Sequence, residues 1–130
     1  MVAGNETTRN GISQGMLALF EHPEQRRRLT AEPAHWATVP DEILRWTSPV
    51  RAMRRVALRE TTLRDRTIQK GQSVVMIYAS ANRDETKFAN PDVFDIDRKT
   101  KPSFGWVRPA DVHRAVRSQA HRIWWVLGVG

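Results

Sequence analysis

The chain has 130 residues, an apolar fraction of 40% and a formal net charge of +7, values that suit a single globular domain. Its basic residues are spread along the chain, so the charge alone does not establish a nucleic-acid or anionic-membrane partner. The absence of cysteine excludes disulfides, thiolate nucleophiles and thiolate metal ligands, and the lack of a long apolar window or signal-peptide pattern predicts a cytoplasmic chain without a membrane span.

The first expected helix runs from about Val2 to Glu21. Its apolar residues follow the i, i+4, i+7, i+8 spacing of an amphipathic helix, and they are Ile12, Met16, Leu19 and Phe20. Residues 3–8 read Ala-Gly-Asn-Glu-Thr-Thr, where a glycine and polar neighbours lower helix propensity and suit a place where something approaches the backbone. An ordinary frayed helix start is the alternative.

A second helix is expected to start at Pro23, because proline fits the first helical turn. The three arginines at 26–28 fall near its C-terminus, where they complement the helix dipole. A solvated helix face explains them better than an RNA site does.

The third expected helix starts after Thr38, a predicted N-cap with Asp41 at the capping-box position, and ends at Pro49. It carries Glu42 and Arg45, whose spacing puts a carboxylate and a guanidinium on neighbouring turns of one face. Such pairs are usually solvated and contribute little. The apolar neighbours here favour a partly buried pair.

Shorter periodicity follows Pro49 and predicts strands. Residues 53–57 and 63–68 suggest two short strands, and Lys70-Gly71 is a turn leading into a β-branched strand over 73–78. A short helix over 79–84 and a loop over 88–95, anchored by Phe88 and Phe94, come next. The expected fold class is α+β, mainly helical with a small antiparallel sheet.

Taken in order, these segments resemble the C-terminal part of a cytochrome P450, a haem-thiolate monooxygenase of the soluble bacterial type. The resemblance covers about residues 2–104, within an expected partial domain of residues 1–105. Residues 3–8 resemble the oxygen-activation motif, and Glu42 to Arg45 resembles the Glu-x-x-Arg helix. Pro49-Val50 followed by Arg55 is similar to the segment where an arginine meets a haem propionate. The meander that approaches the haem-binding loop is resembled by Asn82-Arg83-Asp84, then Phe88, Pro91, Phe94 and Arg98.

The resemblance implies catalytic and haem-binding roles for residues of the first motif. Glu6 and Thr7 match the acid and alcohol that relay protons to oxygen bound on the haem iron. Ala3 and Gly4 match the place where the helix meets the haem. Arg55 matches the arginine that neutralises a haem carboxylate.

The resemblance implies a structural role for Glu42 and Arg45, which would hold the meander, the irregular segment before the haem-binding loop. In many members an arginine from the meander completes this network. The position that matches it here is Val93, so the identity of the third member stays open.

The family activity is oxygen insertion into an apolar small-molecule substrate, with haem as cofactor and a ferredoxin-type redox partner. It depends on a cysteine thiolate bound to the iron, and this chain has no cysteine. We therefore expect haem not to be bound productively, and the chain to be inactive as translated. His113 and His121 are not assigned as replacement ligands, because two histidines outside the resemblance more often do nothing.

The resemblance stops after Phe104-Gly105. Dropping the first base of the Trp106 codon permits Phe-Gly-Gly-Ser-Gly-x-Arg-Thr-Cys-Ile-Gly, a haem-binding loop of this family, with the cysteine codon spanning Val112 and His113. We therefore hypothesise a one-base frameshift and expect residues 106–130 to be an out-of-frame, disordered tail. A basic amphipathic tail that binds a membrane surface is the alternative.

The first motif lies almost at Met1, so we expect most of the substrate pocket to be missing and folding to be marginal. A different class of function also stays open. The chain could be a non-catalytic basic interaction module that binds nucleic acid or an anionic surface, and salt-sensitive binding would favour that reading.

Overall fold

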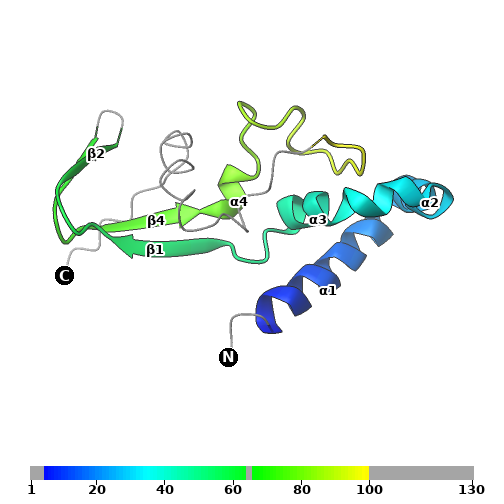
Figure 1. The fold of residues 1–130 in the computed structure, drawn as a ribbon, viewed down its shortest axis with the longest axis horizontal. Helices are drawn as coiled ribbons and strands as arrows, with labels where there is room; N and C mark the ends of the chain where they lie inside the picture. The colour runs from blue at the N-terminus through cyan, green and yellow to red at the C-terminus, as the bar shows by residue number, and fades with distance from the viewer. Residues whose placement is uncertain (1–4, 64–65, 100–130) are drawn as a thin grey trace.

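The computed structural model describes residues 5–63 and 66–99. The helices are α1 (Asn5–Glu21), α2 (Pro23–Ala31), the 3-10 helix η1 (Pro33–Ala37), α3 (Val39–Thr47) and α4 (Tyr78–Ala81). The strands are β1 (Ala52–Val56), β2 (Thr61–Leu63), β3 (Arg66–Ile68) and β4 (Ser73–Ile77). The first three α-helices lie at one end, the strands extend toward the other, and the meander, residues 82–99, runs back over α3 (Figure 1).

Proline and glycine set the element boundaries close to where the sequence predicts them. The helix α1 ends at Glu21 and α2 begins at Pro23, while the predicted start at Val2 lies outside the described residues. The helix α3 ends at Thr47, and Ser48 follows in the left-handed conformation with φ 44° before Pro49. Gly71 has φ +89° in the predicted turn, a conformation that side chains rarely adopt.

The predicted side-chain cap of α3 is wrong. Thr38 does occupy the N-cap position, but its side chain makes no capping hydrogen bond. Its backbone is already helical, with φ −108° and ψ −29°, because η1 runs directly into α3. The hydroxyl instead donates to the carbonyls of His35 and Ile96, each at 3.2 Å, and so ties the helix to the meander.

The strands form two separate two-stranded antiparallel sheets where the sequence predicted one. β1 pairs with β4, with Arg55 opposite Val74. The expected second strand over 63–68 is instead a hairpin, in which β2 pairs with β3 and Thr61 lies opposite Ile68. The single strand was predicted from apolar residues that include Leu63 and Ile68. Both are buried, but Leu63 lies in β2 and Ile68 lies in β3.

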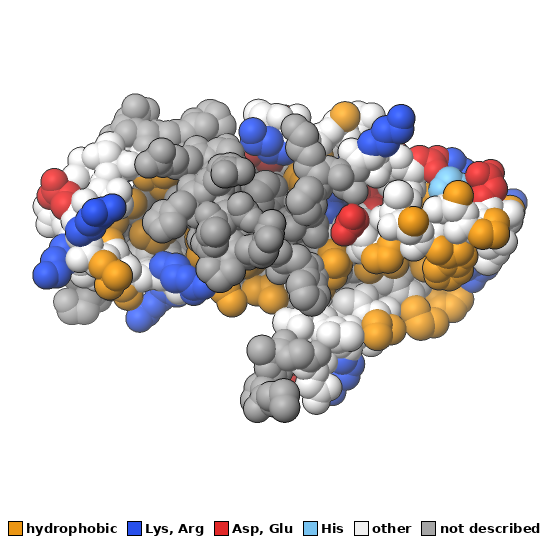
Figure 2. Space-filling model, in the orientation of Figure 1, with side chains coloured by type: hydrophobic (Ala, Val, Ile, Leu, Met, Phe, Trp, Pro, Cys, Tyr) orange, Lys and Arg blue, Asp and Glu red, His pale blue; other side chains and the backbone are white. Residues whose placement is uncertain are grey.

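Most of the predicted apolar face of α1 is exposed, and of its four residues Leu19 alone is half-buried and packs against the core. Ile12, Met16 and Phe20 have exposed fractions of 61%, 53% and 61%, and hydrophobic side chains are visible on the surface along the helices (Figure 2). The residues of α1 that are buried are Gly11, Gly15 and Ala18. These small residues let the backbone of α1 approach α3, and a Cβ on Gly15 would lie 2.6 Å from Cγ2 of Ile43.

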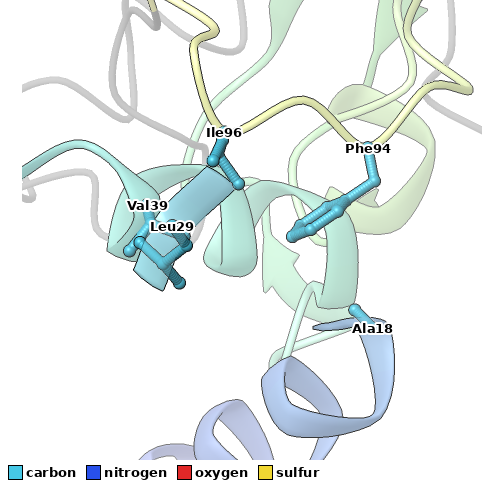
Figure 3. Packing of buried hydrophobic residues seen from close by; sticks show 5 residues of the cluster. All are labelled: Ala18, Leu29, Val39, Phe94 and Ile96. Atoms are coloured by element: carbon cyan, nitrogen blue, oxygen red, sulfur yellow. The ribbon is translucent and has the colours of Figure 1, made fainter. Parts of the chain in front are cut away.

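The hydrophobic core joins the helices to the meander. It consists of Ala18, Leu29, Val39, Phe94 and Ile96, with Leu19, Ile43 and Trp46 packed against it. Phe94 and Ile96 point from the meander toward the helices (Figure 3), and their exposed fractions are 1% and 0%. The prediction that Phe94 anchors this loop is therefore confirmed. Within the described residues, no helix has the length and apolar character needed to cross a membrane.

Candidate functional site

The helix α3 carries the predicted ion pair on its buried side. Glu42 and Arg45 stand one turn apart, and their side chains are 1% and 0% exposed. Nε of Arg45 donates to Oε2 of Glu42 at 2.7 Å, and Nη2 donates to Oε1 at 2.8 Å. The pair is thus bidentate, which is the geometry that gives an arginine–carboxylate contact both strength and orientation.

The remaining N–H groups of Arg45 hold the meander. Nη1 donates to the carbonyls of Asn82 and Pro91, both at 2.8 Å, and Nη2 donates to the carbonyl of Val93 at 3.0 Å. Together with the two bonds to Glu42, this satisfies all five donors of the guanidinium. A buried charge is tolerated when it is paired and fully hydrogen-bonded in this way.

Arg98 provides the third member of this network, which the sequence left open because the matching position is Val93. Nε of Arg98 lies 3.1 Å from Oε2 of Glu42, and the Arg98 side chain is only 10% exposed. Its terminal nitrogens donate to the carbonyls of Ala89, Asn90 and Val93. The side chain of Val93 is 53% exposed, so this residue contributes its backbone carbonyl alone.

A sequence signal for Arg98 existed, because it is the only basic residue between 88 and 98. The resemblance to the family pointed to position 93 instead, where the residue is valine. Glu42 also accepts a hydrogen bond from the backbone N–H of Asp95, at 3.0 Å. Sequence reasoning missed that contact, since a backbone donor carries no residue signature.

Polar residues at the end of α3 extend the network. Asn82 is fully buried and donates through Nδ2 to Oγ of Ser48 at 2.9 Å. Arg83 stacks over the ring of Trp46, with 4.1 Å from Cζ to the ring centroid, and donates to the Trp46 carbonyl at 3.2 Å. Burial, followed by the charge of Arg45, lowers the pKa of Arg83 from its ordinary value. These contacts hold the start of the meander against α3.

The residues predicted to face a haem are not gathered around this network. Glu6 lies in the first turn of α1, where it pairs with Arg9 at 2.7 Å, and both side chains are more than 60% exposed. Thr7, next to it, is half-buried. Arg55 lies on β1 and is exposed, and its guanidinium donates to the Arg54 carbonyl at 3.1 Å and to Sδ of Met53 at 3.5 Å.

Several predicted features lie outside the described residues. They are Ala3, Gly4, the tail over 106–130 and the two histidines in it, His113 and His121. Within the part of the chain that the structure describes, no cluster of three His, Cys, Asp or Glu side chains could hold a metal ion.

The family model described as "Cytochrome P450" matches residues 37–104. That range contains α3, both strand pairs, the meander and every member of the Glu42–Arg45–Arg98 network. The chain belongs to the cytochrome P450 family.

Curated P450 relatives match about four fifths of the chain. The steroid C26-monooxygenase of Rhodococcus jostii (strain RHA1) is 50% identical over 105 residues, which are 81% of this chain and 22% of that protein. The methyl-branched lipid omega-hydroxylase of Mycobacterium tuberculosis (strain ATCC 25618 / H37Rv) is 48% identical over 107 residues, or 82% of this chain and 25% of that protein. The chain thus spans about a quarter of the length of these relatives.

Solved P450 structures share the fold. P450BioI in complex with an acyl carrier protein ligated to hexadec-9Z-enoic acid has a TM-score of 0.80 at 38% identity and covers 90% of this chain and 30% of its own. CYP109E1 from Bacillus megaterium in complex with corticosterone has a TM-score of 0.79 at 33% identity, with 92% of this chain and 33% of its own covered. The α+β P450 architecture with a small antiparallel sheet is therefore confirmed.

The cofactor of the P450 family is haem, held through a cysteine thiolate on the iron. The donor set of this chain does not fit that group, because none of its 130 residues is a cysteine. What the described residues do supply is the Glu42–Arg45–Arg98 network that orders the meander.

Proposed function

We propose that this chain is a non-catalytic part of a bacterial P450-type monooxygenase, and that it does not insert oxygen by itself. The observation that supports this proposal is that the chain has the ion-pair network described above and lacks the iron ligand. Glu42 is paired with both Arg45 and Arg98, at 2.7 Å and 3.1 Å, whereas the sequence contains no cysteine to ligate the iron. The network can order the meander without haem, but the push of electron density that cleaves the O–O bond needs the thiolate.

The proposed roles of the haem-facing residues follow from the same contrast. Arg55 keeps its guanidinium on the exposed side of β1, where a haem carboxylate could accept from it. Glu6 and Thr7 match the proton relay of the family, and we assign them no catalytic step in this chain. Ala3 and Gly4 stay proposed haem neighbours on the resemblance alone.

The substrate class proposed for the whole protein is an apolar lipid. The relatives include a steroid C26-monooxygenase and a methyl-branched lipid omega-hydroxylase, and both names give an apolar lipid as the substrate. A ferredoxin-type protein is the proposed electron donor, by family.

The direct test is haem reconstitution. The purified chain is mixed with haem, reduced and exposed to carbon monoxide, and the difference spectrum is recorded. We expect no absorption of the kind that thiolate-ligated iron gives, and no oxygenated product from steroid or branched-lipid substrates. A thiolate-type spectrum from the chain as it stands would overturn the proposal.

A matched pair of chains separates the missing ligand from a general folding failure. In one chain the residues after Gly105 follow the shifted frame and restore the glycine-rich loop with its cysteine, and in the other that cysteine is serine. A thiolate-type spectrum in the first chain alone would locate the defect at the ligand.

The frameshift itself is tested at the DNA level. Sequencing the codons of residues 104–114 should show TGC in the shifted frame, formed by the last two bases of the Val112 codon and the first base of the His113 codon. Any other triplet there rejects the frameshift hypothesis.

A further inference from the structure

The strand end of the molecule concentrates the positive charge of the chain. Residues 51–72 contain seven Arg or Lys residues and two acidic residues. Their net charge of +5 is most of the formal net charge of +7 of the whole chain. Arg54, Arg59, Arg66 and Lys70 are all exposed. None of these four side chains forms an ion pair with another residue of the described ranges 5–63 and 66–99.

Exposed apolar side chains lie among these charges. Leu58, in the turn after β1, is 87% exposed, Val56 is 47% exposed and Met53 is 39% exposed. Because side chains alternate along a strand, Arg54 and Val56 share one face of β1. Hydrophobic and basic side chains lie next to each other at this end of the molecule in Figure 2.

This combination has a specific physical meaning. Basic side chains gain roughly 1 kcal/mol each near an anionic leaflet, which is about a fivefold gain in binding per charge. Apolar side chains beside them can enter the boundary between headgroups and acyl chains. Basic side chains without apolar neighbours would gain the electrostatic contribution only.

We propose that the ribbon surface, formed by Arg54, Leu58, Arg59, Arg66 and Lys70, docks on an anionic phospholipid bilayer. The partner is selected by charge complementarity and by the exposed leucine among the basic groups. A nucleic acid fits less well, because residues 50–77 contain no aromatic side chain on which a base could stack. This role goes beyond the proposed monooxygenase lineage and does not depend on haem.

The test is flotation of the full chain with vesicles of phosphatidylcholine and phosphatidylglycerol, compared with vesicles of phosphatidylcholine alone. The ribbon variant carries Arg54→Gln, Arg59→Gln and Lys70→Gln. It should bind the anionic vesicles roughly a hundredfold more weakly, from about fivefold per charge. Leu58→Ser alone should weaken binding by about tenfold and leave its salt dependence unchanged.

The matched control removes the same charge elsewhere. It carries Arg26→Gln, Arg27→Gln and Lys87→Gln, three exposed positions away from the ribbon. We expect this variant to keep nearly all binding, and circular dichroism should show the same fold for both triple variants.

Three results would overturn the proposal. The first is equal loss of binding in the ribbon and control variants, which would reflect net charge alone. The second is full binding by the ribbon variant, which would place any vesicle contact outside the ribbon surface. The third is tighter binding to DNA or RNA than to anionic vesicles, lost in the ribbon variant, which would assign this surface to nucleic acid.

Discussion

Arg45 joins α3 to the meander through five side-chain hydrogen bonds. It is fully buried, binds Glu42 through two nitrogens and donates to three backbone carbonyls of the meander. These carbonyls lie between 37 and 48 residues away in the sequence. The meander has no regular secondary structure of its own. The Arg45 guanidinium therefore supplies hydrogen-bond donors that a neighbouring strand would otherwise give to the meander carbonyls.

Arg45→Lys should destabilise the chain strongly although it keeps the charge. An ammonium has three donors and cannot bind a carboxylate bidentately, so Glu42 and several carbonyls would be left buried without partners. We expect a loss of about 3 kcal/mol in the free energy of unfolding, or loss of the cooperative transition, in urea titrations followed by circular dichroism. The exposed Arg9→Lys is the control and should change stability by less than about 0.5 kcal/mol.

Arg98→Ala and Val93→Ala together test which residue completes the network. Removing the Arg98 guanidinium takes away the contact to Glu42 and the donations to the meander carbonyls. We expect a loss of about 2 kcal/mol in the free energy of unfolding, together with faster amide hydrogen exchange over residues 89–95. Val93→Ala keeps the backbone carbonyl and should stay within about 0.5 kcal/mol. A loss on Val93→Ala as large as that on Arg98→Ala would contradict the role assigned to Arg98.

At the scale of elements, the contact between α1 and α3 depends on residues without side chains. Gly15 and Gly11 lie on the buried face of α1. A Cβ at position 15 would come within 2.6 Å of Ile43, whereas at position 11 the nearest atom, Cγ of Pro49, is 3.5 Å away. The two glycines thus have the same helix propensity and different steric surroundings.

Gly15→Ala and Gly11→Ala should therefore change stability in opposite directions. Alanine favours a helix by about 1 kcal/mol over glycine, and Gly11→Ala should gain most of this. In Gly15→Ala the clash with Ile43 should outweigh that gain and lower the free energy of unfolding by about 1–2 kcal/mol net. Urea titrations of both variants measure this difference, and equal stabilisation by both would show that α1 does not pack closely on α3.

At the scale of the whole molecule, the apolar side chains on α1 affect association. Ile12, Met16 and Phe20 follow one another at every fourth position and are more than half exposed. An exposed apolar stripe on a helix is a site of self-association or aggregation. The described residues do not cover this stripe, so burying it requires contact with another surface.

Ile12→Glu with Met16→Glu should reduce association of the chain. Two charges on the stripe oppose contact between copies, so sedimentation velocity should show a smaller average species and less dependence on concentration. Ser13→Glu with Gln14→Glu adds the same charge at two neighbouring exposed positions outside the stripe. That control should leave association nearly unchanged, and an equal effect of both pairs would attribute the change to net charge.

The sequence by itself determined the break between α1 and α2, the end of α3, the turn at Gly71 and the absence of the iron ligand. Pro23, Pro49 and Gly71 act through the backbone of their own residue or its neighbour, so their effects are readable locally. The pair Glu42 and Arg45 was readable because a helix places residues three apart on one face. The missing thiolate needed only a count of cysteines.

Only the tertiary structure decided which face of α1 is buried and which arginine joins Glu42. Apolar periodicity favoured the stripe from Ile12 to Phe20, but close approach of α1 to α3 requires the glycine face. Arg98 lies far along the chain from Glu42, and its guanidinium reaches the carboxylate because Phe94 and Ile96 anchor the meander in the core. Both outcomes depend on contacts between distant residues, whose energies are absent from any local pattern.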